Sequence, residues 1–361
     1  MITLDYSDYS APGRVCLFGE HQDYLKLPVI PAAINLRTNV AVKKKQSQTI
    51  SVSSQKLSIS DEFTSKKSLK IGNNSFDYLR AILIVLYREN IVDNIPGFDV
   101  KISSDIPIGS GLSSSAALLV AWLTALNDQL DLSLTKLEIA DICFQAENQI
   151  MGINCGIMDQ YSSSLGGIFS LDCDGPPYKI ESFETNFQKL IIGDTQIHRD
   201  ANEPLTQLKT QLFSGLRKIQ NEGDYSIKTL SIDDLNNLQN KITESEYSKL
   251  TGAISIRTIT QEAVNELSKK KQDVDYLGQL LTNQQELLRE KLGVSIPKLD
   301  KLIHASIEAG GLGGKLTGAG LGGCVVILAP DKEDDVAKAI EKVGGKAYKC
   351  EIDYSGGRNE K

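Results

Sequence analysis

The chain has 361 residues, a length that favours two domains over one. With 41% hydrophobic and 24% charged residues it is typical of a globular protein in water, and a net charge of −7 leaves no basic field for a nucleic-acid backbone. The first five residues lack the pattern of a secretory leader, and apolar stretches such as 81–86 are too short to cross a bilayer. We therefore expect neither nucleic acid nor a membrane as a partner.

The cysteine pattern indicates a reducing compartment. Six cysteines occur, at positions 16, 143, 155, 173, 324 and 350, and no two of them form a C-x-x-C pair. Several lie in apolar runs, where a free thiol behaves as a small hydrophobic group. This spacing favours neither disulfides nor a zinc site, so we expect a cytoplasmic protein.

The first half of the chain alternates strand and helix patterns. Runs of β-branched and apolar residues predict strands at 39–43, 49–53, 98–103 and 167–172. A long apolar run predicts a buried helix over 76–89, with Ser75 as its N-cap. The lysine-rich stretch 56–74 is interpreted as a solvated loop or flap.

A second helix and the C-terminal half follow. Thr135 and Glu138 form a capping-box pattern that opens a helix to about Met151. Further on, the patterns predict strands at 190–193, 324–329 and 347–352, and helices through 271 and at 277–291, 297–309 and 334–343. This mixture predicts an α+β fold with two domains, 1–185 and 186–361.

The segment 107–117, with the sequence PIGSGLSSSAA, carries the strongest chemical signal. It follows a predicted strand and precedes a helix expected from Ser113 to about Gln129. Gly109 and Gly111 lack a Cβ, so the backbone there can turn tightly and approach a ligand. Free amides, serine hydroxyls and the positive end of the helix dipole would together bind a phosphate. The alternative is an ordinary capped helix after a glycine loop.

Two other nucleotide motifs can be ruled out from the sequence. No Gly-Lys-[Ser/Thr] occurs at the spacing of a Walker A loop. Residues 318–323, GAGLGG, satisfy the G-x-G-x-x-G fingerprint, which requires a strand before it and a helix after it. Because a strand at 324–329 follows instead, we reject a dinucleotide site.

The loop at 107–117 resembles the phosphate-binding motif of the GHMP kinases, the superfamily of galactokinases, homoserine kinases, mevalonate kinases and phosphomevalonate kinases. Residues 11–24, APGRVCLFGEHQDY, resemble the substrate-side motif of this family. Residues 315–324, KLTGAGLGGC, resemble its third, glycine-rich motif, which abuts the phosphate loop. The galactokinase branch fits best, because GEHQDY at 19–24 and CGIMDQ at 155–160 resemble its sugar-binding patterns.

The resemblance implies a fold and a reaction. The fold would be the two-domain α+β GHMP kinase fold, with a ribosomal protein S5 domain 2-like N-terminal domain and a ferredoxin-like C-terminal domain. The reaction would transfer the γ-phosphoryl group of ATP to a sugar hydroxyl, with galactose to galactose 1-phosphate as the leading case and Mg²⁺ as the metal. The partners would be the sugar and ATP, and the protein would be a monomer or a homodimer.

The resemblance also assigns roles to matching positions. Asp159 would face the hydroxyl that is phosphorylated, with Arg14 beside it. The sugar would contact Glu20, His21, Asp23 and Gly156. The ATP phosphates would lie on Gly109, Ser110, Gly111, Leu112, Ser113, Ser114, Ser115 and Ala116. Mg²⁺ would be held by Ser115 and Glu147.

The chemistry of these residue types fits phosphoryl transfer. The reaction needs a group that orients the attacking hydroxyl, positive charge on the transferred group, and a metal that bridges phosphate oxygens. Asp159 can orient or deprotonate a hydroxyl, and Arg14 supplies a fixed cation that would hold it ionised. Mg²⁺ prefers oxygen ligands and keeps several waters, so one hydroxyl and one carboxylate suffice. Glu147, twelve residues before Asp159, would lie on the same wall of the site.

Each role has a structural alternative. Residues 20–23 could form an exposed polar turn. Asp159 could be a helix N-cap or a structural ion-pair partner. Ser113 and Ser114 could cap the helix backbone rather than bind a ligand.

Some positions depart from the galactokinase pattern. Leu25 stands where galactokinases usually carry asparagine, and residues 198–206 lack the tyrosine usually found there. His198 and Arg199 could reach the substrate or belong to a solvated loop. A different hexose, N-acetylgalactosamine or a uronic acid therefore stays an alternative to galactose.

Two further functions compete with sugar phosphorylation. The third motif has the sequence TGAGLGG, which leans towards mevalonate kinases, whereas Asp23 and residues 155–160 argue against mevalonate as the substrate. A non-catalytic sugar and ATP sensor would be expected to lose part of the serine-alanine run, which is complete here at 113–117.

Overall fold

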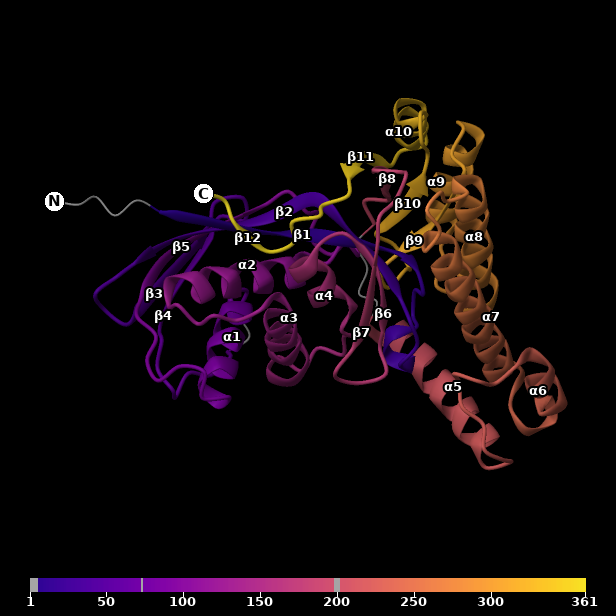
Figure 1. Ribbon diagram of the computed structural model, residues 1–361, viewed down its shortest axis with the longest axis horizontal. Coiled ribbons are helices and arrows are strands. Elements are labelled where there is room, and N and C mark those ends of the chain that lie inside the picture. The colour runs from indigo at the N-terminus through magenta and orange to yellow at the C-terminus, as the bar shows by residue number, and fades with distance from the viewer. Residues whose placement is uncertain (1–5, 73, 198–201) are drawn as a thin grey trace.

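The computed structural model describes residues 6–72, 74–197 and 202–361. Their strands form two sheets with helices packed on each, which confirms the α+β architecture. Figure 1 shows the first sheet and its helices on the left and the second sheet with its helices on the right. The strands change from the first sheet to the second between residues 183 and 189. We keep 1–185 and 186–361 as the proposed domains.

The first sheet has the order β12-β1-β2-β5-β3-β4, and β6 pairs with both β2 and β7. Its strands are β1 (Ser7–Phe18), β2 (Ile30–Lys44), β3 (Thr49–Ser54), β4 (Ile59–Thr64), β5 (Phe98–Ser104), β6 (Ile168–Asp172), β7 (Lys179–Phe183) and β12 (Arg358–Asn359). The pairs are antiparallel apart from β3 with β5, which run parallel. The long β1–β2 pair is the platform from which the site is built.

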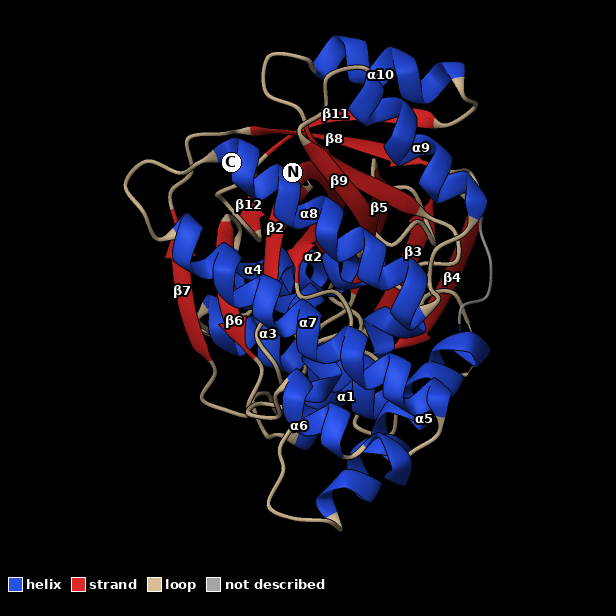
Figure 2. Cartoon of the chain, turned by 90° about the vertical axis from the view of Figure 1, so that its right-hand side faces the viewer, coloured by secondary structure: helices blue, strands red, loops and turns tan. Residues whose placement is uncertain are grey.

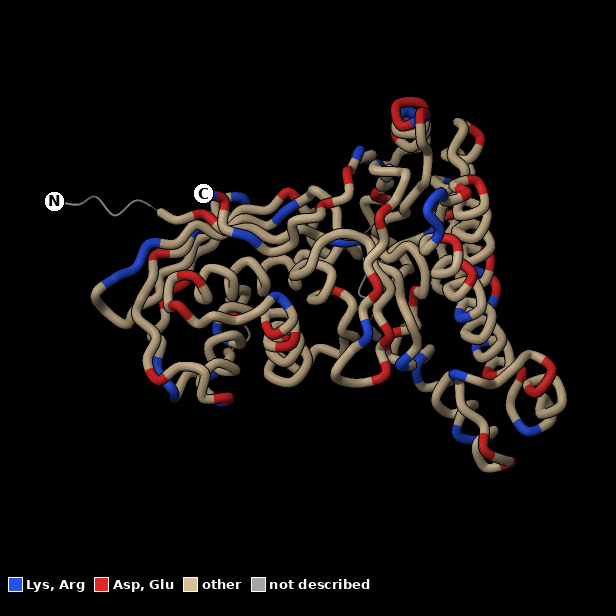
Figure 3. The backbone as a smooth tube through the Cα atoms, viewed as in Figure 1, with Lys and Arg blue, Asp and Glu red and all other residues tan. Residues whose placement is uncertain are grey.

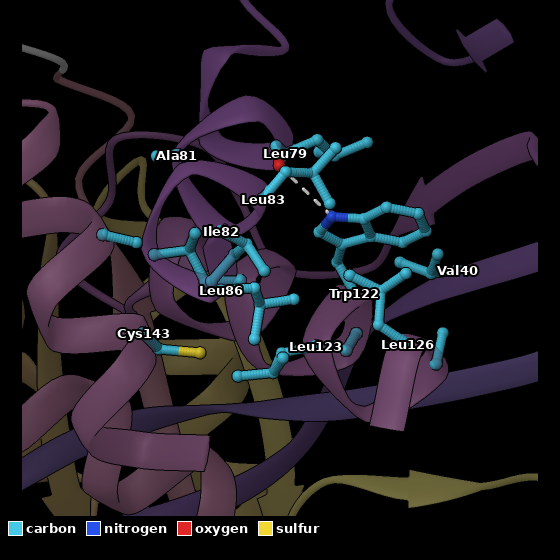
Figure 4. Close-up of a cluster of buried hydrophobic side chains, with 14 of the residues drawn as sticks. Val40, Leu79, Ala81, Ile82, Leu83, Leu86, Trp122, Leu123, Leu126 and Cys143 are labelled. Carbon is cyan, nitrogen blue, oxygen red and sulfur yellow. Dashed lines mark hydrogen bonds between the residues drawn. The ribbon is translucent and has the colours of Figure 1, made fainter. Parts of the chain in front are cut away.

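Four helices pack with the first sheet around a continuous apolar core. They are α1 (Asp77–Arg88), α2 (Ser114–Gln129), α3 (Lys136–Gln145) and α4 (Met158–Leu165). Trp122 of α2 is fully buried, meets the ring of Phe98 edge-on at 5.9 Å, and donates its Nε1–H to the Leu79 carbonyl at 3.3 Å. Figure 4 shows this side chain among Val40, Leu83 and Leu126. Burial of this α2 face fixes the N-terminal end of the helix, where the predicted phosphate loop lies.

The second sheet has the order β11-β8-β10-β9 and is antiparallel throughout. Its strands are β8 (Lys189–Asp194), β9 (Gly313–Thr317), β10 (Cys324–Leu328) and β11 (Lys346–Glu351). The helices of this half are α5 (Asn202–Gln220), α6 (Ile232–Asn237), α7 (Glu244–Leu267), α8 (Val274–Leu287), α9 (Pro297–Glu308) and α10 (Glu333–Lys342). Figure 2 shows α8 and α9 running in front of the strands of this half.

The chain returns to the first sheet at its C-terminal end. Strand β12 pairs with β1 through Tyr9↔Asn359 and Ser10↔Arg358, and Figure 1 shows this yellow segment lying beside β1. The buried Arg37 donates to Gly356 O at 2.7 Å and forms an ion pair with Asp353. The two halves are therefore joined by more than the single connection near residue 185.

Charged residues of both signs are interspersed over the two halves in Figure 3. No helix within residues 6–72, 74–197 or 202–361 has the length and hydropathy of a transmembrane segment.

Most of the predicted elements are confirmed near their expected bounds. The capping box is present, with Thr135 Oγ1 accepting the Glu138 N–H, and α3 continues into a π-helical turn over Ala146–Ile150. The rejection of a dinucleotide site also agrees with the structure, because residues 318–323 join strands β9 and β10.

Two local predictions were wrong. Residues 56–74 are not a plain loop, because they contain β4; this edge strand is mostly exposed and has the polar composition of a loop. Ser75 is not the N-cap of α1; Phe76 holds that position without a side-chain cap. The first turn is anchored by Asp77, whose carboxylate accepts the backbone N–H groups of Gly72 and Asn74 at 2.9 Å.

Candidate active site

The segment 107–117 forms a tight turn that leads directly into α2. Gly109 and Gly111 have φ of 67° and 80°, and Ser113, directly before the helix, has φ of 60°. These left-handed conformations favour glycine and explain its presence at two of the three positions. The free N–H groups of the first turn of α2 lie next to the half-buried serines 114 and 115. The turn therefore has the anion-binding features expected from the sequence.

The glycine-rich motif of the second domain packs closely against this turn. A Cβ on Gly111 would lie 2.6 Å from the Thr317 carbonyl oxygen, and a Cβ on Gly323 would lie 2.6 Å from the Ser110 carbonyl oxygen. Gly318 has φ of 84° and would meet Gly111 in the same way. Backbone from both domains thus forms one wall, and only glycine leaves room for this approach.

Asp159 lies in the first turn of α4 and is bound by two other predicted site residues. Its Oδ1 accepts hydrogen bonds from Arg14 Nε at 2.9 Å and from Arg14 Nη2 at 2.7 Å. Its Oδ2 accepts a hydrogen bond from the Ser113 hydroxyl at 2.6 Å. The Asp159 side chain is 26% exposed whereas that of Arg14 is 5% exposed, so the carboxylate rather than the guanidinium is open to a ligand.

Ser113 does not cap α2, although it occupies the N-cap position. Its side chain makes no capping hydrogen bond, because the left-handed backbone at this residue turns the hydroxyl towards Asp159. Arg14 also donates to the Gly111 carbonyl. The phosphate loop and the carboxylate are therefore coupled through Ser113 and Arg14.

Glu20 and His21, from the connection between β1 and β2, are buried rather than in an exposed turn. Glu20 Oε2 accepts a hydrogen bond from the fully buried Lys315 Nζ at 2.8 Å. Burial and then Lys315 lower the pKa of His21 to about 3, so its imidazole is neutral at neutral pH. The imidazole hydrogen bonds with the backbone of Ala319, while its buried Nε2 has no partner among the described residues. A neutral ring nitrogen without a partner is suited to a ligand hydroxyl.

Asp23 packs directly against Gly156. A Cβ on Gly156 would overlap the Asp23 carboxylate, so glycine is required for this approach. Asp23 Oδ1 accepts the Tyr24 N–H at 2.8 Å. Burial, and then the charge of Asp159, raise the pKa of Asp23 to about 6. The structure thus brings Asp23, Gly156 and Asp159 into one electrostatic environment.

Glu147 and Ser115, the predicted metal ligands, also lie together. Glu147 is buried in the π-helical turn after α3, and its Oε2 accepts a hydrogen bond from Gln160 Nε2 at 2.6 Å. Burial raises the pKa of Glu147 to about 7. The hydrogen bond from the Ser115 hydroxyl lowers this pKa, and the negative charge of Asp159 raises it further. Both groups offer oxygen donors beside the phosphate loop, which is the ligand chemistry that Mg²⁺ prefers.

An apolar cavity of about 340 Å³ borders Ser114 and Ser115 at the start of α2. Its walls include Ile102, Ile106 and Tyr78 from β5, the loop after it and α1. This cavity was not predicted, because the residues that line it are scattered over 38–118 and form no local motif.

Other functional candidates were missed for the same reason. Lys315 and Thr317 were recognised only as parts of a glycine-rich motif, yet Lys315 neutralises Glu20 and Thr317 Oγ1 accepts the Cys16 N–H at 2.9 Å. Lys209 of α5, in the second half of the chain, reaches the predicted sugar-binding segment, residues 19–24. Its ammonium group lies 4.4 Å from the centre of the Tyr24 ring. Its helical pattern is that of an ordinary polar helix and carries no local signal.

The structure describes only some of the residues that depart from the galactokinase pattern. Leu25 is 5% exposed and packs in the apolar core of the second half, so it is a packing residue rather than part of the site wall. His198 and Arg199 lie outside the described residues.

Comparison with known families agrees with this geometry. The family profile "GHMP kinases N terminal domain" matches residues 77–167, and "GHMP kinases C terminal" matches residues 261–350. The "Galactokinase galactose-binding signature" matches residues 7–44, which include β1, Arg14 and the connection to β2. The fold and the site thus define a phosphotransferase of the GHMP kinase class.

Individual relatives show to which branch of the GHMP kinases the chain belongs. The chain is 32% identical over 345 residues to the galactokinase of Thermococcus kodakarensis, covering 94% of each chain. It is 29% identical to that of Clostridium beijerinckii, covering 96% of this chain and 90% of the relative. The crystal structure of Lactococcus lactis galactokinase complexed with galactose matches with a TM-score of 0.87 and 26% identity, over 98% of this chain and 95% of the other. The chain belongs to the galactokinase family.

Proposed function

We propose that this protein transfers the γ-phosphoryl group of ATP to the anomeric hydroxyl of galactose, giving galactose 1-phosphate. The observation that carries the proposal is the position of Asp159. Its carboxylate is held by Arg14 and by Ser113 of the phosphate loop, and it lies in one environment with Asp23 of the sugar segment. An acceptor hydroxyl beside Asp159 would therefore face a phosphate bound at the loop.

In this mechanism Asp159 orients the attacking hydroxyl and receives or directs its proton. Arg14 holds Asp159 through two hydrogen bonds and adds fixed positive charge where the phosphoryl group passes. Because Ser113 donates to the other carboxylate oxygen, the position of Asp159 depends on the loop that binds the nucleotide. Positioning and charge are the main contributions a protein makes to phosphoryl transfer.

The nucleotide would lie along the N-terminal end of α2. The amides of the 109–116 turn and the dipole of this sixteen-residue helix would bind the phosphates. The apolar cavity beside Ser114 and Ser115, about 340 Å³ in volume, is large enough for a purine base. Tyr78 and Ile106 line this cavity and would contact the base.

The residues at the proposed metal position fit Mg²⁺. Ser115 and Glu147 offer hard oxygen ligands and share a hydrogen bond. A bound cation would compensate the buried negative charge of the Glu147 carboxylate. When bound, Mg²⁺ would neutralise phosphate charge during the transfer. No group of three or more His, Cys, Asp or Glu able to hold a metal occurs in the described part of the chain, so water and phosphate oxygens would complete its coordination.

The sugar would be recognised by hydroxyl contacts. Asp23 and His21 offer an acceptor and an unpartnered ring nitrogen, and Gly156 lets the Asp23 carboxylate pack directly against the backbone of residue 156. Galactose is favoured over other hexoses, N-acetylgalactosamine and uronic acids by the galactose-binding signature at 7–44 and by the galactokinase relatives.

Mevalonate is the main alternative substrate. The mevalonate kinase of Methanococcus jannaschii matches with a TM-score of 0.72 and 25% identity, over 96% of this chain. The half-buried Asp23 carboxylate beside Gly156 favours a polyhydroxylated acceptor. A non-catalytic sensor is disfavoured because Asp159, Arg14 and Ser113 are joined by hydrogen bonds in one catalytic arrangement.

Replacing Asp159 with Asn tests the mechanism. Sugar binding should be retained, while kcat falls roughly 100-fold or more, as expected on loss of a group that orients or accepts a proton. Turnover would be measured as ATP consumption with galactose, N-acetylgalactosamine, galacturonate and mevalonate, and binding by calorimetry. Near-normal kcat in D159N would refute the role of Asp159, and turnover of mevalonate alone would refute a sugar substrate.

All six cysteines are free thiols, and five of them are buried. This supports the proposed cytoplasmic location, where thiols stay reduced. A monomer or a homodimer stays the proposed assembly.

A further inference from the structure

Lys209 crosses from α5 of the second half to two segments of the sugar site. Its Nζ donates to Asn154 Oδ1 at 3.0 Å and to the Asn154 carbonyl at 3.2 Å. The same ammonium group lies 4.4 Å from the centre of the Tyr24 ring. One cation thus holds both an amide residue and an aromatic face, a combination of charge-assisted hydrogen bonding and cation–π attraction.

The two partners of Lys209 flank the contact that defines the sugar pocket. Tyr24 follows Asp23 and donates its backbone N–H to Asp23 Oδ1. Asn154 precedes Gly156 by two residues, and Gly156 faces the Asp23 carboxylate so closely that a Cβ would overlap it. Lys209 therefore joins the two segments that carry the contact between Asp23 and Gly156.

Lys209 also acts on the charge of the pocket. Burial lowers the pKa of Lys209, and the Asp23 charge opposes this, so the two groups are close enough to interact. Burial and Asp159 raise the pKa of Asp23, whereas the Tyr24 N–H and Lys209 act in the opposite direction. The other titratable groups that interact with Asp23 are Glu20, Tyr24, Cys16, Cys155 and Cys173. Among the residues that the structure describes, Lys209 is the cation of this group.

We propose that Lys209 is a positioning residue for the sugar, which holds the segments of Asp23 and Gly156 in contact and places a positive charge near the Asp23 carboxylate. The inference rests on the proposed sugar kinase activity. The sequence motifs place every predicted sugar-binding residue in the first half of the chain. Lys209 adds one from the second half.

The test compares K209M, which keeps the length of the side chain and removes its charge, with K209R. In K209M the KM for galactose should rise about 10-fold, the loss expected for one charge-assisted contact, with the KM for ATP unchanged and kcat within about 3-fold. The acid limb of kcat/KM against pH should move to higher pH, because Asp23 would protonate more readily without the cation. K209R should restore both the KM and the acid limb in large part.

R217M is the matched control, since Arg217 is an exposed cation on the same helix whose Nε donates to the Phe213 carbonyl of that helix. It should leave the galactose KM and the pH profile unchanged. An unaltered KM and acid limb in K209M would overturn the role of Lys209 while leaving the kinase proposal intact. Equal effects of K209M on the KM values for galactose and ATP would indicate a general structural role and overturn it too. Absence of sugar phosphorylation by the wild-type protein would instead overturn the proposed function and this inference together.

Discussion

The two carboxylates nearest the phosphate loop have different surroundings. Asp159 divides its oxygens between the guanidinium of Arg14 and the Ser113 hydroxyl, and it is partly exposed. Glu147 is buried with the neutral partners Ser115 and Gln160, and burial raises its pKa to about 7. One carboxylate therefore carries its compensating charge within the protein, while the other is left to be compensated by a bound cation.

Glu147 should make folding stability depend on pH. Its pKa is raised above the ordinary value of 4.5, so the folded state binds a proton more tightly than the unfolded state between about pH 4.5 and 7. Ionisation of Glu147 therefore costs stability as the pH rises through this window. Relative to the wild type, E147Q should gain unfolding free energy as the pH rises, approaching about 1.4 kcal/mol per pH unit.

Urea unfolding without metal or nucleotide, at intervals from pH 5 to 7.5, would measure this difference. His21, whose lowered pKa has the opposite effect on stability, cancels because both proteins contain it. A difference between E147Q and wild type that does not change with pH would contradict the prediction.

Sequence reasoning identified the residues that form motifs and missed those that act across the fold. Asp159 and Arg14 are 145 positions apart, yet each belongs to a recognisable segment, and the structure joins them. Lys209 has no such segment, because its role depends on where α5 lies relative to Tyr24 and Asn154. A local pattern cannot encode that relation, so it needed the tertiary structure.

At the scale of elements, the loop before α2 and the β9–β10 connection form a single backbone wall. Gly111 approaches the Thr317 carbonyl, and Gly323 approaches the Ser110 carbonyl, so each segment restricts residue size in the other. The nucleotide would therefore meet an anion site shaped by both halves of the chain.

Replacing Gly111 with Ala should disrupt this wall. The residue has φ of 80°, and the new Cβ would lie 2.6 Å from a backbone oxygen that has little room to move. The KM for ATP should rise about 10-fold or more, while galactose binding is retained; a 10-fold rise corresponds to about 1.4 kcal/mol. Steady-state kinetics and galactose calorimetry would measure the two effects.

G175A is a control that separates two effects of G111A, namely the contact of the new Cβ with the Thr317 carbonyl and the backbone strain at positive φ. Gly175 has φ of 82°, but no atom lies within 4 Å of the position that a Cβ would occupy, so the substitution introduces the same strain, about 1–2 kcal/mol, without the contact. If G175A raised the ATP KM as much as G111A, the close approach would not be the cause.

Helices and strands were predicted correctly where the local sequence pattern matches the burial of the side chains. The buried run of α1 and the capping box of α3 were recognised, whereas β1 was not assigned as a strand. Pro12 and Gly13 interrupt the strand pattern of β1, and the register shifts between them, a β-bulge that no alternation rule anticipates. The edge strand β4 was missed because only one of its residues is buried.

At the scale of the whole molecule, a buried ion pair holds the halves together. Lys315 of β9 donates to Glu20 Oε2 at 2.8 Å and to the Cys16 carbonyl at 2.7 Å, and neither charged side chain is more than 3% exposed. A buried pair of this kind adds little net stability, but removing one partner leaves an uncompensated charge.

K315M should therefore lower the unfolding free energy by about 3–5 kcal/mol. The double variant E20Q/K315M should recover part of this loss, since no buried charge is left without its partner. Guanidinium unfolding followed by the fluorescence of Trp122, in the core of the first half, would measure both. A double variant less stable than K315M by the full additive amount would show that the two residues do not interact.

The buried Arg37 gives the chain an order of assembly. Its guanidinium is satisfied by Ser10 within the first sheet and by Asp353 and Gly356, which are far later in the sequence. On the ribosome, the first half emerges with this charge already in place and its distant acceptors not yet synthesised. The N-terminal half therefore gains its last Arg37 contacts only when nearly the whole polypeptide has been made, and a nascent chain arrested before residue 353 would lack them.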